Sequence, residues 1–594
     1  MFRNPVILLL AAALLSACSL SARKVHEVDG LVEQHRETAV DCPTETDRCA
    51  EPSPLLDLGV RAAHEGAHHV TLVEFGEDAL KLRLHLARSA RERIDVQNFI
   101  LRKDMTGELF LNALLDAARR GVKVRLLLDQ MFSFSDAEYL VLLTMTHSNL
   151  EVRFYNPSFD KAKMAKHDWL TGLACCFRRV NQRMHNKLQI VDDTVGVTGG
   201  RNIADRYFDF DTNYQFKDRD VVVFGETAVA MRDSFDWFWD SPKTVPVQYL
   251  RDVAAELLAN EPGQLRPYVP PERFASLLAE LDDPGRMAEL FVEPAFAVDR
   301  IRYFSDQPRK LAFENPDPNY DVTEVLYDIL LSARSSVLIQ SPYMVLSKRA
   351  RKVFKRLRDE NPDIELVYST NSLASTDADT VYANTHRHKK RYVRDLGFNM
   401  YEFKPFPQGA PDFFPRWPDL IEEKKQGVTS DSTVSGDDST IPMPSPRVGL
   451  HSKSFVVDGR VAMIGSHNFD PRSEGFNTEN GIIVWDDKFA SRVEELIRRD
   501  VEPGNSWVVA MKPKGEQAET ALEPPPGMAD YEPWPRSDSS VYELAPGKEA
   551  LPPGHPDFYR NHYAMGSFPE VVKTRRQYLV IFLGSFFFFL EPIL

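Results

Sequence analysis

The feature that most constrains this chain is one short motif that occurs twice. "MHNKLQIVD" (184–192) and "LHSKSFVVD" (450–458) both place a Lys two residues after a His and an Asp five residues after that Lys. One copy alone would be weak evidence. Two copies predict two related halves, because a chain of 594 residues exceeds what one hydrophobic core usually supports.

Each copy of the motif follows the pattern of a βαβ unit. A strand pattern, an amphipathic helix pattern and a second strand pattern occur in this order in both halves. The expected elements lie at 90–100, 106–121 and 122–129, and again at 333–344, 347–362 and 364–370. This order predicts an α/β fold with two tandem domains, each a mixed β-sheet flanked by helices.

The motif itself predicts paired polar side chains at one end of a hairpin. A His and a Lys two residues apart on a strand project from the same face. Asp458-Gly459 is a hairpin turn signal, and each return strand ends in small residues and an amide. These are Gly200 and Asn202 in the first copy, and Ser466 and Asn468 in the second.

Two such hairpins brought together would form one site with a pseudo-two-fold axis. One imidazole could attack as a nucleophile while the other protonates a leaving group. Two Lys and two Asn could stabilise the charge that develops at a phosphodiester, without a metal. The alternative, two unrelated polar strand ends, does not explain why the same spacing occurs twice.

The duplicated motif resembles that of the phospholipase D superfamily, over roughly residues 70 to 500. The resemblance implies a phosphohistidine intermediate and neither metal nor cofactor. By analogy His185 is the nucleophile and His451 the acid, although the reverse assignment stays open. It places the phosphate against Lys187, Lys453, Asn202 and Asn468, with Ser466 and Gly200 beside it.

The same resemblance assigns the acidic residues. It counts Asp192 and Asp458 with the catalytic motif, although we expect them to fix the hairpins rather than touch substrate. It gives Glu479, and less directly Asp218, the role of hydrogen-bonding a catalytic His.

Longer stretches, such as "GSHNFDPRSEGFNTENG", resemble the bacterial cardiolipin synthase branch, particularly its lipoprotein-like members. This implies transfer of a phosphatidyl group to phosphatidylglycerol, from phosphatidylglycerol or phosphatidylethanolamine, at a membrane surface. A secreted phospholipase D or phosphodiesterase that uses water is the alternative, since it shares every catalytic residue. A nucleic-acid substrate is disfavoured by the net charge of −15, and a catalytically dead scaffold by the complete motifs.

The N-terminus has the layout of a secretory signal, with Arg3, an apolar run and then Cys18. The tetrad "LSAC" resembles a bacterial lipoprotein box, which implies acylation of Cys18 after removal of the signal, residues 1–18 by our boundary. The chain is then expected in the cell envelope, anchored by lipid and facing the periplasm. Ser19, rather than an Asp, follows Cys18, which by the resemblance favours sorting to the outer membrane.

The remaining boundaries follow from composition. We expect a tether at 19–65, a first domain at 66–290, a second at 291–500 and a C-terminal extension at 501–594. Residues 405–447, rich in Pro, Ser and Thr, are expected to form a mobile inserted loop. The apolar run 578–590 is too short to span a bilayer, so it either packs on the core or enters the interface.

The cysteines other than Cys18 predict no zinc site. Cys42 and Cys49 could close a small loop in an oxidising compartment. Cys175 and Cys176 are adjacent, so buried thiols are the expectation for them.

Overall fold

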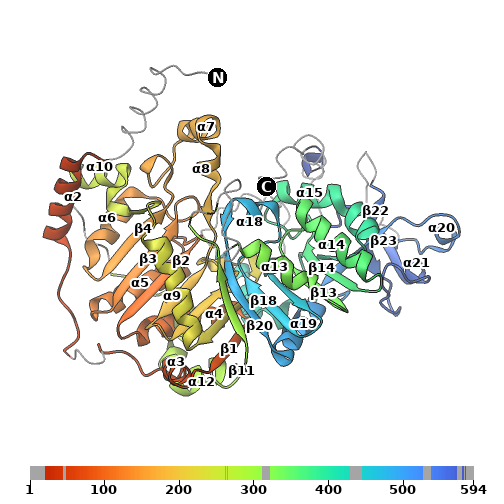
Figure 1. Cartoon of the computed structure of the whole chain (residues 1–594), viewed down its shortest axis with the longest axis horizontal. Coiled ribbons are helices and arrows are strands. Elements are labelled where there is room, and N and C mark those ends of the chain that lie inside the picture. The colour runs from red at the N-terminus through yellow and green to blue at the C-terminus, as the bar shows by residue number, and fades with distance from the viewer. Residues whose placement is uncertain are drawn as a thin grey trace.

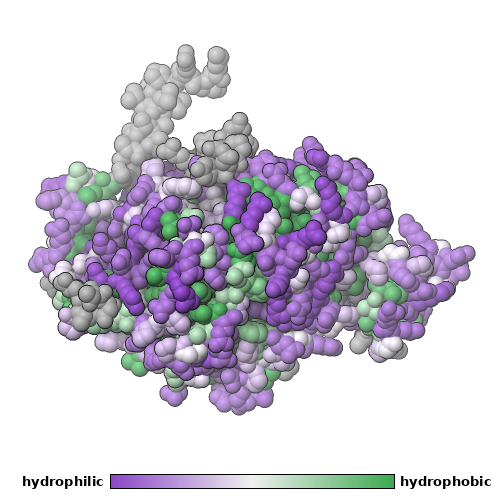
Figure 2. All heavy atoms as spheres, turned by 60° about the horizontal axis from the view of Figure 1, so that its bottom comes forward, coloured by the Kyte–Doolittle hydropathy of each residue, from purple (hydrophilic) through white to green (hydrophobic). Residues whose placement is uncertain are grey.

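The computed structural model describes residues 20–43, 48–260, 263, 265, 267–308, 310, 321–428, 445–525, 537–570, 578–580 and 582. Two sheets lie side by side, each flanked by helices (Figure 1). The face in Figure 2 carries mainly hydrophilic side chains, with smaller apolar patches between them. The predicted α/β fold with two tandem domains is confirmed.

The first sheet has nine strands, and its centre is the predicted βαβ unit. From edge to edge it runs β10 (Thr244–Pro246), β4 (Leu150–Tyr155), β3 (Lys123–Asp129), β2 (Arg93–Asn98), β6 (Leu188–Val191), β7 (Val195–Gly199), β9 (Asp220–Phe224), β1 (His68–Val73) and β11 (Phe296–Val298). β2, β3 and β4 are parallel, while β6 and β7 form the hairpin that carries the first motif.

The second sheet repeats this arrangement. Its order is β12 (Ile301–Ser305), β20 (Asn480–Trp485), β18 (Val461–Gly465), β17 (Ser454–Val457), β13 (Ser336–Gln340), β14 (Glu365–Asn371), β15 (Asn399–Phe403), β21 (Ser506–Met511), β22 (Ser539–Leu544) and β23 (His562–Gly566). β13, β14 and β15 are parallel, and β17 and β18 form the second hairpin. The duplication therefore extends from the motif to the whole centre of each sheet.

Helices cover the sheets, and one core is shared by both halves. The larger helices are α4 (Gly76–Ser89), α5 (Met105–Arg119), α6 (Ala137–Thr146), α9 (Glu226–Trp239), α10 (Arg251–Ala259), α13 (Val322–Leu331), α14 (Lys348–Glu360), α15 (Asp379–Lys390) and α19 (Asp487–Asp500). Apolar side chains of α9 and α19 pack in one buried cluster with strands of both sheets. Burial of this shared surface holds the halves together.

The expected tether at 19–65 is wrong for its described residues, which belong to the first domain. α2 (Ala22–His35) and α3 (Pro54–Glu65) pack on that domain's core. Val28 and Val32, four residues apart, point to one face of α2 and are buried. Cys18 and the signal lie outside the described residues.

The chain crosses between the sheets later than expected. α12 (Pro284–Phe291) and β11 belong to the first half, so the crossing lies at 299–300 rather than at 291. The C-terminal extension continues the second sheet through β21, β22 and β23. Among the described residues, no helix has both the length and the apolar character needed to cross a membrane.

The expected mobile loop at 405–447 is wrong for residues 405–428 and 445–447. α16 (Ala410–Phe413) and α17 (Trp417–Lys425) are folded, and β16 (Arg447–Leu450) begins at the end of the segment. Phe413, Phe414 and Trp417 are buried in a separate apolar cluster, which anchors this segment despite its polar composition. Residues 429–444 lie outside the described residues.

One cysteine prediction is confirmed and the other is wrong. Cys42 and Cys49 form a disulfide. Cys175 and Cys176, expected as buried thiols, form a disulfide with each other. They lie where α7 (Lys166–Cys175) meets α8 (Phe177–Asn181), and Cys175 is exposed, so no core encloses these sulfurs.

Candidate active site

Two short sheets that cross the interface determine the site. β5 (Arg183–Met184) pairs with β19 (Asn477–Thr478), and β8 (Tyr214–Lys217) pairs with β16, both in parallel. Met184 lies opposite Thr478, and Leu450 lies opposite Lys217. In each pair the next residue of one strand is a motif His and the next residue of the other is a carboxylate. The register therefore places a histidine of one half beside a carboxylate of the other.

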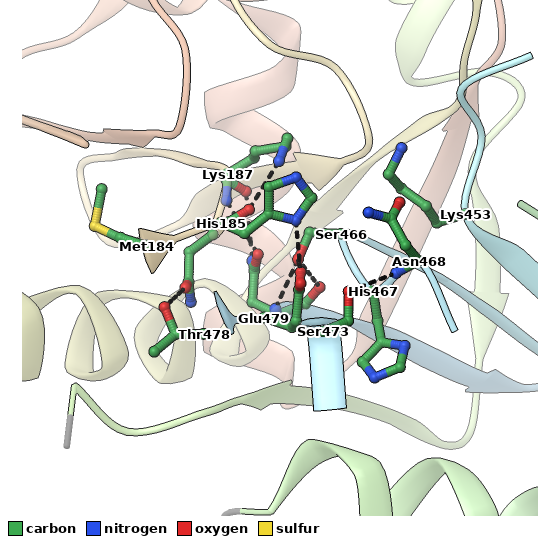
Figure 3. Close-up of polar contacts among 12 residues, drawn as sticks. Met184, His185, Lys187, Lys453, Ser466, His467, Asn468, Ser473, Thr478 and Glu479 are labelled. Atoms are coloured by element: carbon green, nitrogen blue, oxygen red, sulfur yellow. Dashed lines mark hydrogen bonds and ion pairs between the residues drawn. The ribbon is translucent and has the colours of Figure 1, made fainter. Parts of the chain in front are cut away.

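The two histidine–carboxylate contacts follow from this register. His185 Nδ1 lies 2.8 Å from Glu479 Oε2, and His451 Nδ1 lies 2.5 Å from Asp218 Oδ2. Figure 3 shows the His185 ring held against Glu479, with Lys453 and Asn468 across from it. Because each Nδ1 contacts a carboxylate, Nε2 is the ring nitrogen left to react.

Both motif lysines are buried beside these pairs. Lys187 Nζ donates to the His185 carbonyl at 2.8 Å, and Lys453 Nζ lies 3.0 Å from His451 Nδ1. Burial, only partly offset by Glu479, lowers the pKa of Lys187 to about 7. Burial likewise lowers the pKa of Lys453 to about 8, against the attraction of Asp218. A bound phosphodiester anion would favour the charged form of both.

The two histidines differ in their electrostatic surroundings. Burial, followed by the charges of Lys187 and Lys453, holds the pKa of His185 well below its ordinary value. Burial and Lys453 also lower the pKa of His451, but Asp218 and then Asp377 oppose them. The neutral form of His185 is therefore favoured, whereas His451 has two carboxylates that favour its protonated form.

The two amides of the motif are buried with an unused oxygen each. Asn202 Nδ2 donates to the Tyr207 hydroxyl at 2.9 Å. Within the described part of the chain, Asn202 Oδ1 and Asn468 Oδ1 have no hydrogen-bond partner. Such groups are costly unless a ligand or water completes them, which is consistent with a place for substrate.

Gly200 and Ser466 lie against the two carboxylates of the site. The Ser466 hydroxyl donates to Glu479 Oε2. A Cβ at Gly200 would lie 2.1 Å from Asp218 Oδ1, so the Asp218 carboxylate occupies the space that a side chain at 200 would need. Both residues therefore help to position Asp218 and Glu479, and their contact with the phosphate stays a prediction.

Asp192 and Asp458 lie at the opposite end of their strands from the histidines. The Asp192 carboxylate accepts from the backbone N–H groups of Arg91, Glu92 and Arg93 at 2.8–2.9 Å. Asp458 accepts in the same way from Arg334, Ser335 and Ser336. They fasten each hairpin to the start of the neighbouring strand, as expected, and they lie away from the two histidines rather than with the catalytic groups.

Sequence reasoning missed the aromatic walls and one acidic residue. Phe99 meets His185 edge-on at 4.8 Å, and Tyr207 meets His451 edge-on at 5.0 Å between ring centres. Asp377, whose Oδ1 accepts from the Tyr343 hydroxyl at 2.9 Å, raises the pKa of His451 against the larger effect of burial. Neither group has a spacing that relates it to the motif, so no pattern could have singled it out.

Comparison with known proteins agrees with this site. The family described as "Cardiolipin synthase, PLD-like domain" matches residues 84–239 and 326–501, so each match contains one His-Lys motif. An uncharacterised protein of Helicobacter pylori (strain ATCC 700392 / 26695) is 32% identical over 461 residues, 77% of this chain and 84% of the relative. Cardiolipin synthase C of Escherichia coli (strain K12) is 31% identical over 442 residues, 74% of this chain and 86% of the relative.

Among solved structures, phosphatidylserine synthase of Haemophilus influenzae Rd KW20 matches with a TM-score of 0.47 and 12% identity, over 75% of this chain and 91% of that one. The family match covers both halves and more than half of the chain, and the relatives are aligned over most of their length. The chain is a phospholipase D-type enzyme, and it belongs to the phospholipase D-like cardiolipin synthase family.

Proposed function

We propose that the chain is a cardiolipin synthase-like phosphatidyltransferase that works through a phosphohistidine. The observation that carries the proposal is the crossed pairing of His185 with Glu479 and of His451 with Asp218. Two buried lysines lie beside these pairs, so one site holds a nucleophile, an acid and two cations. The relationship to cardiolipin synthase C supports a phospholipid substrate.

The first half of the reaction forms a P–N bond. His185 Nε2 attacks the phosphorus of the donor lipid, and the bond from phosphorus to the head-group oxygen breaks. Protonated His451 gives its proton to that oxygen, so the head group leaves as a neutral alcohol. Lys187, Lys453 and the two motif amides stabilise the charge on the remaining phosphoryl oxygens.

The second half reverses these roles. Now neutral, His451 takes the proton of a glycerol hydroxyl of phosphatidylglycerol while that oxygen attacks phosphorus. The P–N bond breaks, His185 is restored, and cardiolipin is the product. Burial supports transfer over hydrolysis, because His185 and His451 are only 5% and 7% exposed and a lipid that fills the site leaves little room for water.

The test is to incubate the detergent-purified full chain with phosphatidylglycerol, with and without head-group-labelled phosphatidylethanolamine, and to identify the products by mass spectrometry. We expect cardiolipin from the wild type and none from His185→Ala or His451→Ala. His147→Ala, at a buried histidine outside the site, is the matched control and should retain activity. Released ethanolamine would identify a second donor, whereas phosphatidic acid without cardiolipin would show a hydrolase and overturn the proposal.

We also propose that Cys18 is acylated and anchors the chain in the cell envelope, facing the periplasm, with Ser19 favouring the outer membrane. The support is the sequence "LSAC" alone. Labelled palmitate should enter the wild type and not Cys18→Ser, and fractionation of the envelope should recover the wild type with outer-membrane markers. Equal labelling of both chains would contradict the anchor.

A further inference from the structure

Three exposed apolar side chains of the first half lie on segments that are hydrogen-bonded to one another and lead to His185. Phe132, Trp169 and Leu170 are 45%, 39% and 71% exposed. Phe132 lies 5.0 Å from Phe99 between ring centres, and Phe99 in turn contacts His185. A single exposed apolar residue is ordinary on a protein surface, but these three lie on segments that are joined to each other and to the site.

Side-chain hydrogen bonds of Gln130 and Asn156 connect these segments. The Gln130 side chain donates to the Lys161 carbonyl at 2.7 Å and accepts from the Ser158 N–H at 2.9 Å, which ties the Phe132 loop to the start of segment 158–182. Asn156 donates to two carbonyls near the end of that segment, both at 2.8 Å. The chain then enters β5 and His185. Figure 1 shows α7 and α8 of this segment projecting from the upper edge of the first half.

Segment 158–182 carries the opposite charge to the chain as a whole. It contains five Lys and Arg against two Asp, in a chain whose net charge is −15. Lys163 and Lys166 are exposed beside Trp169 and Leu170. A tryptophan and a leucine among exposed lysines is the composition of a helix that lies in the interface of an anionic bilayer.

The second half also carries exposed apolar side chains, on a segment that packs beside the loop after β14. Tyr578, Leu579 and Phe582 are 44% to 50% exposed, while Val580 between them is buried against Leu373 and Tyr382. Leu373 lies two residues after Asn371, which exchanges two hydrogen bonds with Leu450, the residue before His451. In the first half Asp129 accepts in the same manner from Met184, the residue before His185. Phe132 thus lies on the loop after β3, and Val580 packs on the loop after β14; each of these strands ends in a residue that is hydrogen-bonded to the neighbour of a motif histidine.

We propose that this face docks on a bilayer that contains anionic phospholipid, with Phe132, Trp169 and Leu170 on one side of the site and Tyr578, Leu579 and Phe582 on the other. The inference rests on the proposed function, since it supplies the two histidines with lipid directly from the bilayer. Lys163 and Lys166 attract the anionic head groups, and the apolar side chains enter the interface. The basic run 386–394 contributes less, because Lys389 is buried against Glu402 and Lys390 pairs with Asp538.

The test measures hydrogen–deuterium exchange of the full chain carrying Cys18→Ser, so that no acyl chain at that position contributes to binding. Vesicles contain either phosphatidylcholine alone or phosphatidylcholine with phosphatidylglycerol. We expect slower exchange at 130–134 and 166–175 with the anionic vesicles, and unchanged exchange in α14. Exchange that does not change at 166–175 overturns the proposal, as does protection that depends on protein concentration without vesicles, which would indicate a second copy of the chain.

Matched variants separate charge from apolar contact. Lys163→Gln with Lys166→Gln should lower partition onto the anionic vesicles about 30-fold. The control Lys355→Gln with Arg356→Gln removes two exposed charges from α14 and should leave it unchanged. Trp169→Ser with Leu170→Ser should lower partition about tenfold, while Val60→Ser with Val269→Ser, at exposed positions elsewhere, should not. Equal effects of test and control variants overturn the proposal.

A separate activity assay distinguishes failure of this inference from failure of the proposed function. With short-chain phosphatidylglycerol dispersed as monomers, the 163/166 and 169/170 variants should match the wild type, because no bilayer has to be bound. With vesicles they should be slower in proportion to their binding. Vesicle binding without any cardiolipin would refute the transferase but not the docking surface. Cardiolipin formed without protection at 166–175 would refute the docking surface but not the transferase.

Discussion

Gly200→Ala is the substitution that tests the crossed pairing most directly. The added Cβ would lie 2.1 Å from Asp218 Oδ1, whereas an ordinary contact begins at 3.4 Å. The Asp218 carboxylate must then retreat by about 1 Å, and a misplacement of that size in a reacting group costs on the order of 100-fold. We therefore expect kcat to fall about 100-fold, which corresponds to about 2.7 kcal/mol of transition-state stabilisation.

The assay is initial rate of cardiolipin formation per folded molecule, with the melting temperature measured on the same sample. Gly59→Ala is the matched control, since its Cβ would lie 2.7 Å from the Thr194 carbonyl, outside the site. Both substitutions should lower the melting temperature, but only Gly200→Ala should lower kcat. The reasoning is refuted if Gly200→Ala keeps kcat within about threefold of the wild type, a loss of only about 0.6 kcal/mol.

Three further predictions concern the charges of the site and the hydrogen bonds that hold the first hairpin. The value of kcat/KM should fall as pH rises through about 7 to 8, because Lys187 and Lys453 lose the proton with which they bind phosphate; a pH–rate profile that is flat from 6.5 to 9 would contradict it. Asp377→Asn should slow formation of the phosphoenzyme in single turnover, because the Asp377 charge raises the pKa of His451 and so favours the protonated acid of the first step; a single-turnover rate equal to that of the wild type would refute this. Asp192→Ala should lower the free energy of unfolding by about 1–2 kcal/mol through its lost N–H partners, with kcat of the folded fraction unchanged; urea denaturation and initial rates check both parts.

The parts of the fold that could be predicted from sequence are those with local periodicity. The six strands and helices expected around the βαβ units occur within a few residues of their predicted bounds, for example the helix expected at 106–121 and found as α5 (Met105–Arg119). Polar composition misled at 19–65 and 405–428, because a few buried residues such as Val28 and Trp417 were enough to anchor short helices. Composition averages over a window, whereas packing depends on single positions.

The site was predictable as a set of residues but not as a set of contacts. The motif spacing identified both histidines and both lysines, since His and Lys lie two residues apart in each half. Nothing local could show that Glu479 meets His185 across the interface, because 294 residues separate them. Nor could spacing reveal that Gly200 makes room for Asp218, which depends on how two strands approach in space.

The two interface ladders, β5 with β19 and β8 with β16, make activity a property of the contact between the halves. Each half holds a histidine without its carboxylate, so neither half is a complete enzyme, even when its own sheet is intact. Slight separation of the halves would break both dyads at once and leave most of the secondary structure in place. Heat or denaturant should therefore abolish turnover before circular dichroism changes, and two inactive chains, one damaged at His185 and the other at His451, should not rescue each other unless they exchange halves.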